Sequence, residues 1–286
     1  MPHALLLSLD LSQHPRPPAD CTMALHRQIF EWIRHTYGGA EVADALHNRA
    51  HSNFAAMTVA PAQPNPRQRR AVAPGPITQP IQTDYFVTML WPDNAVFVRL
   101  CQGIDASGYA LEIDHNPVTL AQEPEVVADR TYDAFVQSAT SARQVRLRFS
   151  SPTHFTSAGL RQVLPDPVRI FKGYAERWNA FAPPEHELDL EKWERFLRQC
   201  VEVADMNIRT AQRVLKESHR RVTHVGCVGE VAYAVVRPKT PTGEFADDAP
   251  FAACTHTLNL LADYSEFCGT GRMVAQGFGQ TYRLAE

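Results

Sequence analysis

The sequence lacks the motifs of several common classes of protein. Its six cysteines form no CxxC pair, which argues against a zinc site or a disulfide framework and is typical of a reducing compartment. It has no GKS or GKT of a Walker loop and no GxSxG nucleophile elbow. His47 and His51 have the spacing of zinc ligands on a helix, but the HExxH glutamate is missing. We therefore expect no metal and no cofactor.

Long hydrophobic runs and an excess of positive charge are also missing. The opening stretch "MPHALLLSLDLSQHP" has no basic leader and only a short apolar run, so it predicts neither a signal peptide nor a membrane span. The net charge of -3 disfavours a protein that coats nucleic acid non-specifically, although it leaves room for a local basic groove. We expect a cytoplasmic protein with no membrane partner.

The first half of the chain predicts the order β-α-β-β-α-β. The run "ALLLSLDL" is typical of a buried strand, and Asp20 can cap a helix whose apolar face holds Leu25, Ile29, Trp32 and Ile33. The stretches "NFAAMTVAP", "DYFVTMLW" and "GYALEI" predict strands, and "DNAVFVRLCQGI" predicts the second helix. Between them, residues 61–80 form a proline-rich loop that contains "RQRR".

The second half predicts the same order. Residues 143–149 alternate as a strand, and Asp166 with Pro167 begins a helix. Two strand-like stretches follow at about 201–214 and 222–236, the first of which is also compatible with a helix. The stretch "CTHTLNLLADYSEF" predicts an amphipathic helix, and "GQTYRLA" predicts the last strand.

Two such units in tandem indicate an α+β protein with two ferredoxin-like (RRM-like, βαββαβ) domains. The composition, with 44% hydrophobic residues over 286 residues, is compatible with two small domains that each have a core. We place the boundary near Ser138, so that the domains span residues 1–138 and 139–286.

The stretch "GTGRMVAQGFG" lies almost at the end of the chain. A dinucleotide fingerprint needs a strand before the glycines and a helix after them, whereas here the helix comes first. Two interpretations remain. The glycines allow a polynucleotide backbone to come close while Arg272 pairs with a phosphate, or they form a tight turn against the second sheet. The residues concerned are Gly269, Gly271, Arg272, Gly277 and Gly279.

Several stretches together resemble a known family. They are "LRFSSPTHFTSAG", "LPDPVRIFKGYAERWNAF", "GCVGEVAYAV" and "LADYSEFCGTGRMVAQGFGQ", in that order, and in the first half "HRQIFEWIRH" and "ADALHNRAHSNFAAMTVAP". The chain is similar over nearly its whole length to the CRISPR repeat-processing endoribonucleases of the RAMP superfamily. The resemblance implies two ferredoxin-like domains and metal-independent cleavage of precursor CRISPR RNA within each repeat, which leaves a 2′,3′-cyclic phosphate. It also implies that the glycine-rich loop contacts CRISPR repeat RNA and that CRISPR effector subunits are further partners.

The resemblance also implies candidate catalytic residues. In some members a histidine of an "LH" motif is catalytic, which corresponds to His47, and in others a histidine on the first helix is, which corresponds to His26. Members that use the "LH" histidine often carry a tyrosine on the first helix and a lysine shortly after the histidine. This chain has Trp32 at the first position and His51 or Asn53 near the second. These departures leave open an alternative, a non-catalytic RNA-binding subunit of an effector complex.

The residue types suit the chemistry of internal transfer. A histidine can act as general base or acid near neutral pH, and the candidates are His47, His26 and then His51. Arg49 or a protonated His51 can stabilise negative charge on the phosphorus oxygens. In "HRRVTH", at a predicted hairpin tip, Arg220 and Arg221 can hold the backbone of an RNA stem. The alternative for these two arginines is a solvated turn.

Overall fold

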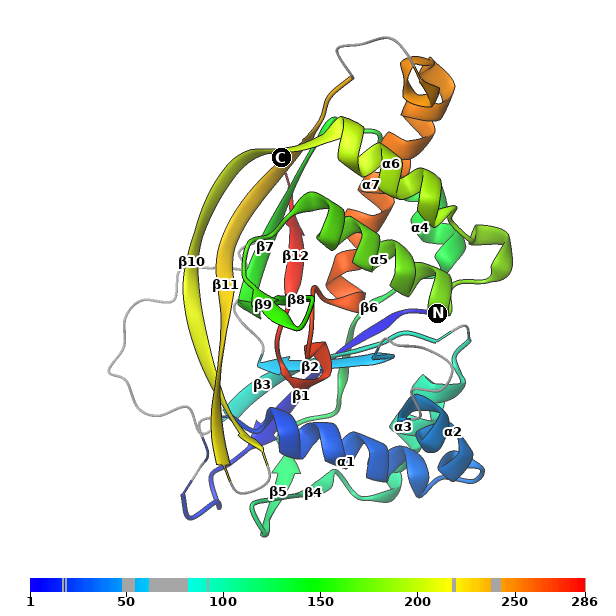
Figure 1. Ribbon diagram of the computed structural model, residues 1–286. Coiled ribbons are helices and arrows are strands. Elements are labelled where there is room, and N and C mark those ends of the chain that lie inside the picture. Colours follow the sequence, from blue (N-terminus) through cyan, green and yellow to red (C-terminus); the bar gives the residue numbers. More distant parts are fainter. Residues whose placement is uncertain are drawn as a thin grey trace.

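The computed structural model describes residues 1–16, 18, 20–47, 55–61, 82–91, 93–217, 220–237 and 243–285. Each half of the chain forms an antiparallel sheet with helices packed on it, as Figure 1 shows. Within these ranges, no helix is both long and apolar enough to cross a bilayer. The predicted contributions of Arg49, His51, Asn53 and the "RQRR" segment fall outside the described residues.

The first half forms a six-stranded sheet with the path β2-β3-β1-β5-β4, and β6 pairs with β1 beside β5. Its elements are β1 (His3–Asp10), α1 (Thr22–Arg34), α2 (Gly39–His47), β2 (Met57–Pro61), β3 (Gln82–Met89), α3 (Ala95–Ala106), β4 (Ala110–Ile113), β5 (Asn116–Leu120), β6 (Glu125–Asp129) and α4 (Tyr132–Ser138).

The predicted strands and helices of this half are present, but its end differs from the prediction. The stretch "GYALEI" forms β4 at the end of the sheet, and the strands that pair with β1 on the side away from β3 are β5 and β6. The chain turns from β4 into β5 at Asp114 and His115, which have φ of 47° and 64°. Aspartate and histidine are among the residues that adopt this left-handed conformation, so a tight hairpin forms without glycine.

The second half forms a four-stranded sheet in the order β10-β11-β7-β12. Its elements are β7 (Gln144–Thr153), β8 (Phe155–Ser157), β9 (Leu160–Gln162), α5 (Pro167–Phe181), η2 (Pro184–His186), α6 (Leu190–Cys200), β10 (Val201–Glu217), β11 (Arg220–Val235), η3 (Glu244–Ala246), α7 (Asp248–Cys268), η4 (Val274–Gln276) and β12 (Thr281–Leu284). The ambiguous stretch is therefore a strand, and it continues to Glu217. The prediction of tandem ferredoxin-like folds is confirmed.

Strand β3 of the first sheet packs on both of its faces. Tyr85, Val87 and Met89 of β3 belong to a core with Leu25, Ile29 and Trp32 of α1 and residues of α3. The alternate residues Phe86 and Thr88 face the second half, because side chains along a strand point to opposite faces: the Thr88 hydroxyl donates a hydrogen bond to Phe267 O at 2.6 Å, and the Phe86 ring meets Tyr282 edge-on. The two halves therefore pack through the face of the first sheet opposite α1.

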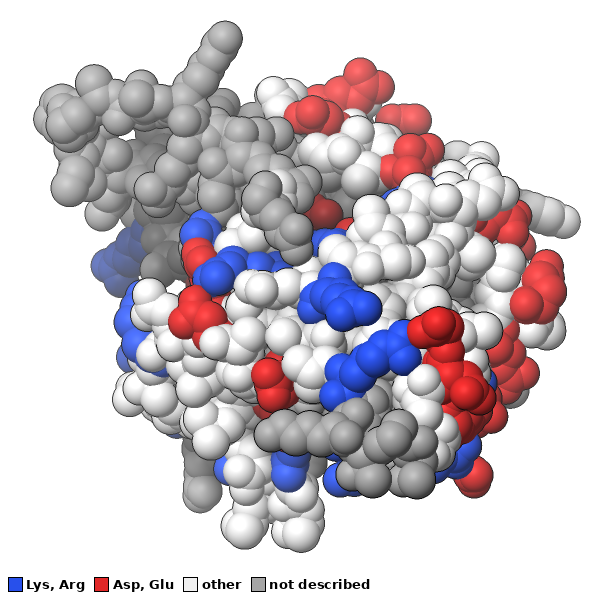
Figure 2. All heavy atoms as spheres, turned by 90° about the horizontal axis from the view of Figure 1, so that it is seen from above, with Lys and Arg blue, Asp and Glu red and all other residues white. Residues whose placement is uncertain are grey.

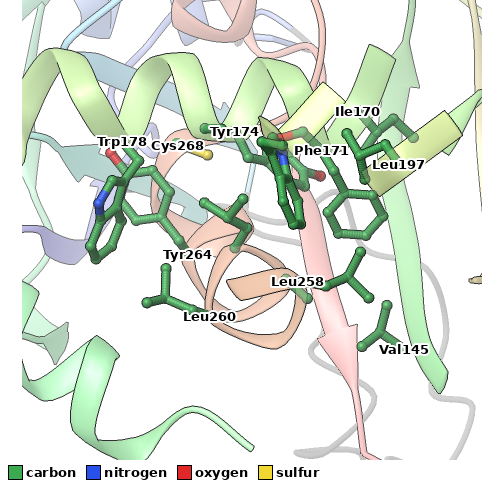
Figure 3. Close-up of a cluster of buried hydrophobic side chains, with 14 of the residues drawn as sticks. Val145, Ile170, Phe171, Tyr174, Trp178, Leu197, Leu258, Leu260, Tyr264 and Cys268 are labelled. Atoms are coloured by element: carbon green, nitrogen blue, oxygen red, sulfur yellow. The ribbon is translucent and has the colours of Figure 1, made fainter. Parts of the chain in front are cut away.

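The second core is rich in aromatic rings. Figure 3 shows Phe171, Tyr174 and Trp178 of α5 beside Tyr264 of α7, with Val145 of β7 at the rim. The helix α7 contacts α5 and α4 as well as β12 and the first sheet. It is therefore buried on most of its sides, more completely than the amphipathic pattern of its sequence predicts. Trp178, Trp193 and Trp32 are all fully buried, as expected for core residues.

The helix α4 ends at the predicted domain boundary. Its Tyr132 and Phe135 pack in the second core, next to Trp178 and Tyr264. The boundary near Ser138 stays a prediction, but the packing ties the last helix of the first half to the second half.

A glycine inside α3 tests how tightly the first core is packed. A Cβ at Gly103 would lie 2.1 Å from Trp32 O on α1, so we expect Gly103→Ala to lower the free energy of unfolding by about 1–3 kcal/mol through overpacking. Urea unfolding measures it. The control is Gly173→Ala on α5, where the nearest atom would be Arg177 Nη1 at 3.5 Å and helix propensity predicts a gain of up to ~1 kcal/mol. Equal stabilisation by both changes would contradict the close approach of α1 and α3.

Candidate nucleic-acid interface

The glycine-rich loop joins α7 to β12. All four of its glycines have positive φ, between 64° and 83°. The loop closes where Thr270 N donates a hydrogen bond to Gly279 O at 2.8 Å, and it is fixed to the end of β7 where Arg272 N donates to His154 O at 2.9 Å. These bonds hold the loop at both of its ends, against β12 and against the end of β7.

The glycines face atoms of the chain itself. A Cβ would lie 1.9 Å from Thr270 O at Gly279, 2.3 Å from His154 O at Gly271, 2.3 Å from Arg213 Nη1 at Gly277 and 3.0 Å from Val274 Cγ1 at Gly269. The loop therefore needs glycine for its own fold, as the tight-turn interpretation expects. Contact of these glycines with RNA stays a prediction.

The loop lies where the two halves meet. Its short helix η4 contacts β2 and α1 of the first half, close to the helix that carries His26. Arg272 is exposed on the loop. A loop of the second half thus contacts the helix of the first half that carries His26, one of the candidate catalytic histidines.

A cluster of rings and guanidinium groups surrounds Phe278 of the loop. The Phe278 ring centroid lies 5.4 Å from that of His154 and 5.6 Å from that of His224. The Arg213 guanidinium lies 5.6 Å from the same centroid. Arg213 and His224 are direct partners across β10 and β11, so their side chains share one face of this hairpin. The Arg161 guanidinium of β9 adds a hydrogen bond to His224 Nδ1 at 3.2 Å.

Burial keeps His154 neutral. Its side chain is only 4% exposed, and burial, together with the positive charge of Arg161 and the neighbouring His224 and Arg272, lowers its pKa to about 4. Its Nδ1 has no hydrogen-bond partner within the described part of the chain. At neutral pH His154 is therefore an uncharged ring that packs against the loop.

The structure places two of the candidate histidines on different helices. His26 lies on α1, partly exposed, with its ring 5.1 Å from that of Phe30. His47 is the last residue of α2; its side chain lies outside the described residues. Leu46, directly before it, packs against both cores, so the end of α2 lies near the junction of the two halves. His26 is the candidate on the helix that touches the glycine-rich loop.

Trp32 does not replace the family's tyrosine in function. Its ring is 2% exposed, inside the first core. An indole that is buried in this way has no access to a substrate. At the position where the family often has a tyrosine, this chain therefore has a core residue.

The two arginines of "HRRVTH" lie at the start of β11. Arg221 is exposed and pairs across the hairpin with Lys216, while the side chain of Arg220 lies outside the described residues. The hairpin end predicted from the sequence is therefore present, and its role in binding RNA stays a prediction.

At the end of the molecule where α6 lies, the basic side chains of the described residues alternate with acidic ones. Figure 2, seen from above Figure 1, shows Lys and Arg interspersed with Asp and Glu there. Arg198 of α6 pairs with Glu194 at 2.6 Å, and Lys192 with Glu244 at 2.9 Å. Over the whole described part of the chain, no three His, Cys, Asp or Glu side chains converge as metal ligands.

Reasoning from the sequence did not single out His154, His224, Arg161 or Arg213. His154 lies in the "SPTHF" stretch and His224 is the last residue of "HRRVTH". Both stretches were noted in the sequence, but neither histidine was predicted to have a function. Arg213 lies in the stretch that was compatible with helix or strand. Only the strand assignment pairs it with His224 and turns it towards the loop.

Comparisons with known proteins bear on this arrangement. Residues 147–281 match the model of a family described as CRISPR-associated endoribonuclease Cas6. Similar solved structures include a Cas6 product complex (TM-score 0.76, 20% identity, 99% of this chain and 100% of that chain) and Thermus thermophilus Cas6 (0.63, 18%, 99% and 98%). A third, described as the product of a Cas6-related gene from Pyrococcus furiosus, has a TM-score of 0.58 at 12% identity and covers 100% of both chains. Among curated proteins no match is found.

The two tandem ferredoxin-like folds of this chain correspond to the fold of these solved Cas6 structures over nearly its whole length. The resemblance stated from the sequence is confirmed by the match of residues 147–281 to the Cas6 family model and by the shared fold.

The buried His154 predicts how stability changes with pH. Its pKa of about 4 in the folded chain is below the ordinary value of about 6.5, so the unfolded chain binds the proton more readily. Stability is therefore full above pH ~6.5 and falls towards pH ~4, by up to about 3 kcal/mol from this group. Urea unfolding at pH ~7 and ~4.5 should show a smaller acid loss for His154→Gln than for the parent. An equal loss in both proteins would mean that His154 is protonated in the folded state.

Proposed function

We propose that this protein is an endoribonuclease that cuts precursor CRISPR RNA within its repeats, without a metal ion, to make mature guide RNAs. One observation carries the proposal: the glycine-rich loop of the second half rests against α1 and β2 of the first. This contact sets the loop that carries the exposed Arg272 against the helix that carries His26, in a chain that resembles Cas6 proteins. CRISPR repeat RNA is the proposed partner, with effector subunits as further partners in the cytoplasm.

The proposed reaction is an internal transfer. The 2′-oxygen attacks the neighbouring phosphorus while a base takes its proton, and the bond from phosphorus to the 5′-oxygen breaks as an acid protonates that oxygen. The products are a 2′,3′-cyclic phosphate and a 5′-hydroxyl. Histidine suits both proton transfers, and a cation such as Arg49, Arg272 or a protonated His51 would stabilise the phosphorane oxygens. This chemistry needs no metal ion.

The alternative is a subunit that binds CRISPR RNA without cutting it. The buried Trp32 favours this alternative, since it removes the tyrosine that often accompanies the "LH" histidine. Incubation with labelled repeat RNA separates the two: the alternative predicts a gel shift without cleavage.

Substitution of the histidines tests the assignment. His47→Ala should slow cleavage of repeat RNA by roughly 10² or more, the scale of a lost general acid or base, with little change in RNA affinity. His26→Ala is the matched comparison, since His26 is the candidate on the helix that contacts the loop. Single-turnover cleavage at saturating protein measures both. If only His26→Ala is slow, the base is on the first helix, and if neither is slow, both assignments are wrong.

Arg272 tests the role of the loop. Arg272→Ala should weaken RNA binding and reduce the slope of log K against log salt by about one phosphate contact, while bound RNA is still cleaved in part. Arg198→Ala, on α6 at the opposite end of the second sheet and paired with Glu194, is the control and should leave the slope unchanged. Binding isotherms at several salt concentrations measure this. An unchanged slope for Arg272→Ala would place the RNA elsewhere.

A further inference from the structure

Arg213 of β10 joins the glycine-rich loop to the first helix. Its Nη1 donates a hydrogen bond to Gly277 O at 2.6 Å. Its Nη2 donates to Thr22 Oγ1 at 2.7 Å and to the carboxylate of Asp20. One guanidinium therefore connects two segments that are distant in the sequence. Its partner in the loop is 64 residues away, and its partner at the start of α1 is 191 residues away.

The helix end that Arg213 holds is the one that carries His26. Thr22 is the first residue of α1, and His26 follows it by four residues, which puts both side chains on one face of the helix about one turn apart. On the other side of the guanidinium, Gly277 lies in the same loop as Arg272. The distance between the loop and His26 therefore depends on this contact.

Burial argues against a direct role of Arg213 in binding RNA. Its side chain is 11% exposed, and its guanidinium covers the ring of Phe278. The planar fork donates in two directions at once, which a lysine ammonium on a flexible stem does not reproduce. Arg213 is thus built into the contact between the halves.

We propose that Arg213 is a positioning residue that sets the first turn of α1, and with it His26, relative to the RNA phosphate held at the glycine-rich loop. This inference rests on the proposed function and deepens it. It names Arg213 as the residue that couples RNA binding by the second half to RNA cleavage by the first half. Arg213 acts through Asp20 and Thr22 on one side and through the carbonyl of Gly277 on the other.

Single-turnover cleavage at saturating protein tests the proposal. Arg213→Ala and Arg213→Lys should each slow cleavage about tenfold or more while RNA affinity and its salt dependence stay within about twofold of the parent. Asp20→Asn should slow it less, and Asp20→Asn with Arg213→Ala should be no slower than Arg213→Ala alone, because the two residues act together. The matched control is Arg209→Ala, an exposed arginine on the same face of β10, which should leave the rate unchanged.

The outcomes separate the positioning role from its alternatives. Parental cleavage rates in Arg213→Ala would overturn the proposal while the proposed function stands. A loss of affinity together with a reduced salt slope would overturn it in favour of direct contact with RNA.

Hydrogen exchange provides a readout that needs no cleavage. Repeat RNA should slow amide exchange in both the loop and the first turn of α1 in the parent, but only in the loop in Arg213→Ala. Equal protection of α1 in the two proteins would overturn the proposal even if the parent cuts no RNA, in which case the proposed function has failed separately.

Discussion

The hydrogen bond from Thr270 N to Gly279 O closes the glycine-rich loop, and the arrangement of the site depends on that closure. The closed loop offers the carbonyl of Gly271 to Arg177 of α5 at 2.6 Å and the hydroxyl of Thr270 to Tyr174 at 2.5 Å. The loop is therefore bonded to residues of the second core and also contacts the first half. A loop held on both sides can place a phosphate precisely, because its own hydrogen bonds are already made.

Most of the fold could be predicted from the sequence, because the hydrophobic pattern and the caps are local signals. Asp166 accepts a hydrogen bond from Arg169 N at 3.0 Å with Pro167 in the first turn of α5, as the start of a helix at that point requires. The pairing of β5 and β6 with β1 was missed, because short strands joined by turns without glycine give little local signal. The burial of α7 was missed as well, since periodicity shows only that a helix has an apolar face and not how many neighbours cover it.

The site was less accessible to sequence reasoning. The loop was singled out by its glycine spacing and His26 by the family resemblance, and their roles stay predictions. The cluster of His154, His224 and Arg213 around Phe278 depends on which strand residues lie opposite one another, and that register is set by tertiary packing. Arg213 illustrates the limit, since its partners lie 64 and 191 residues away.

Cleavage of labelled repeat RNA in excess chelator tests the central claim most directly, with the repeats that lie next to the gene as substrate and the ends of the products identified. The account predicts one cut in each repeat without added metal, with a 2′,3′-cyclic phosphate on the upstream product and a 5′-hydroxyl on the downstream one. Uncut RNA, cleavage that returns only with added magnesium or zinc, or a 5′-phosphate on the downstream product would contradict it.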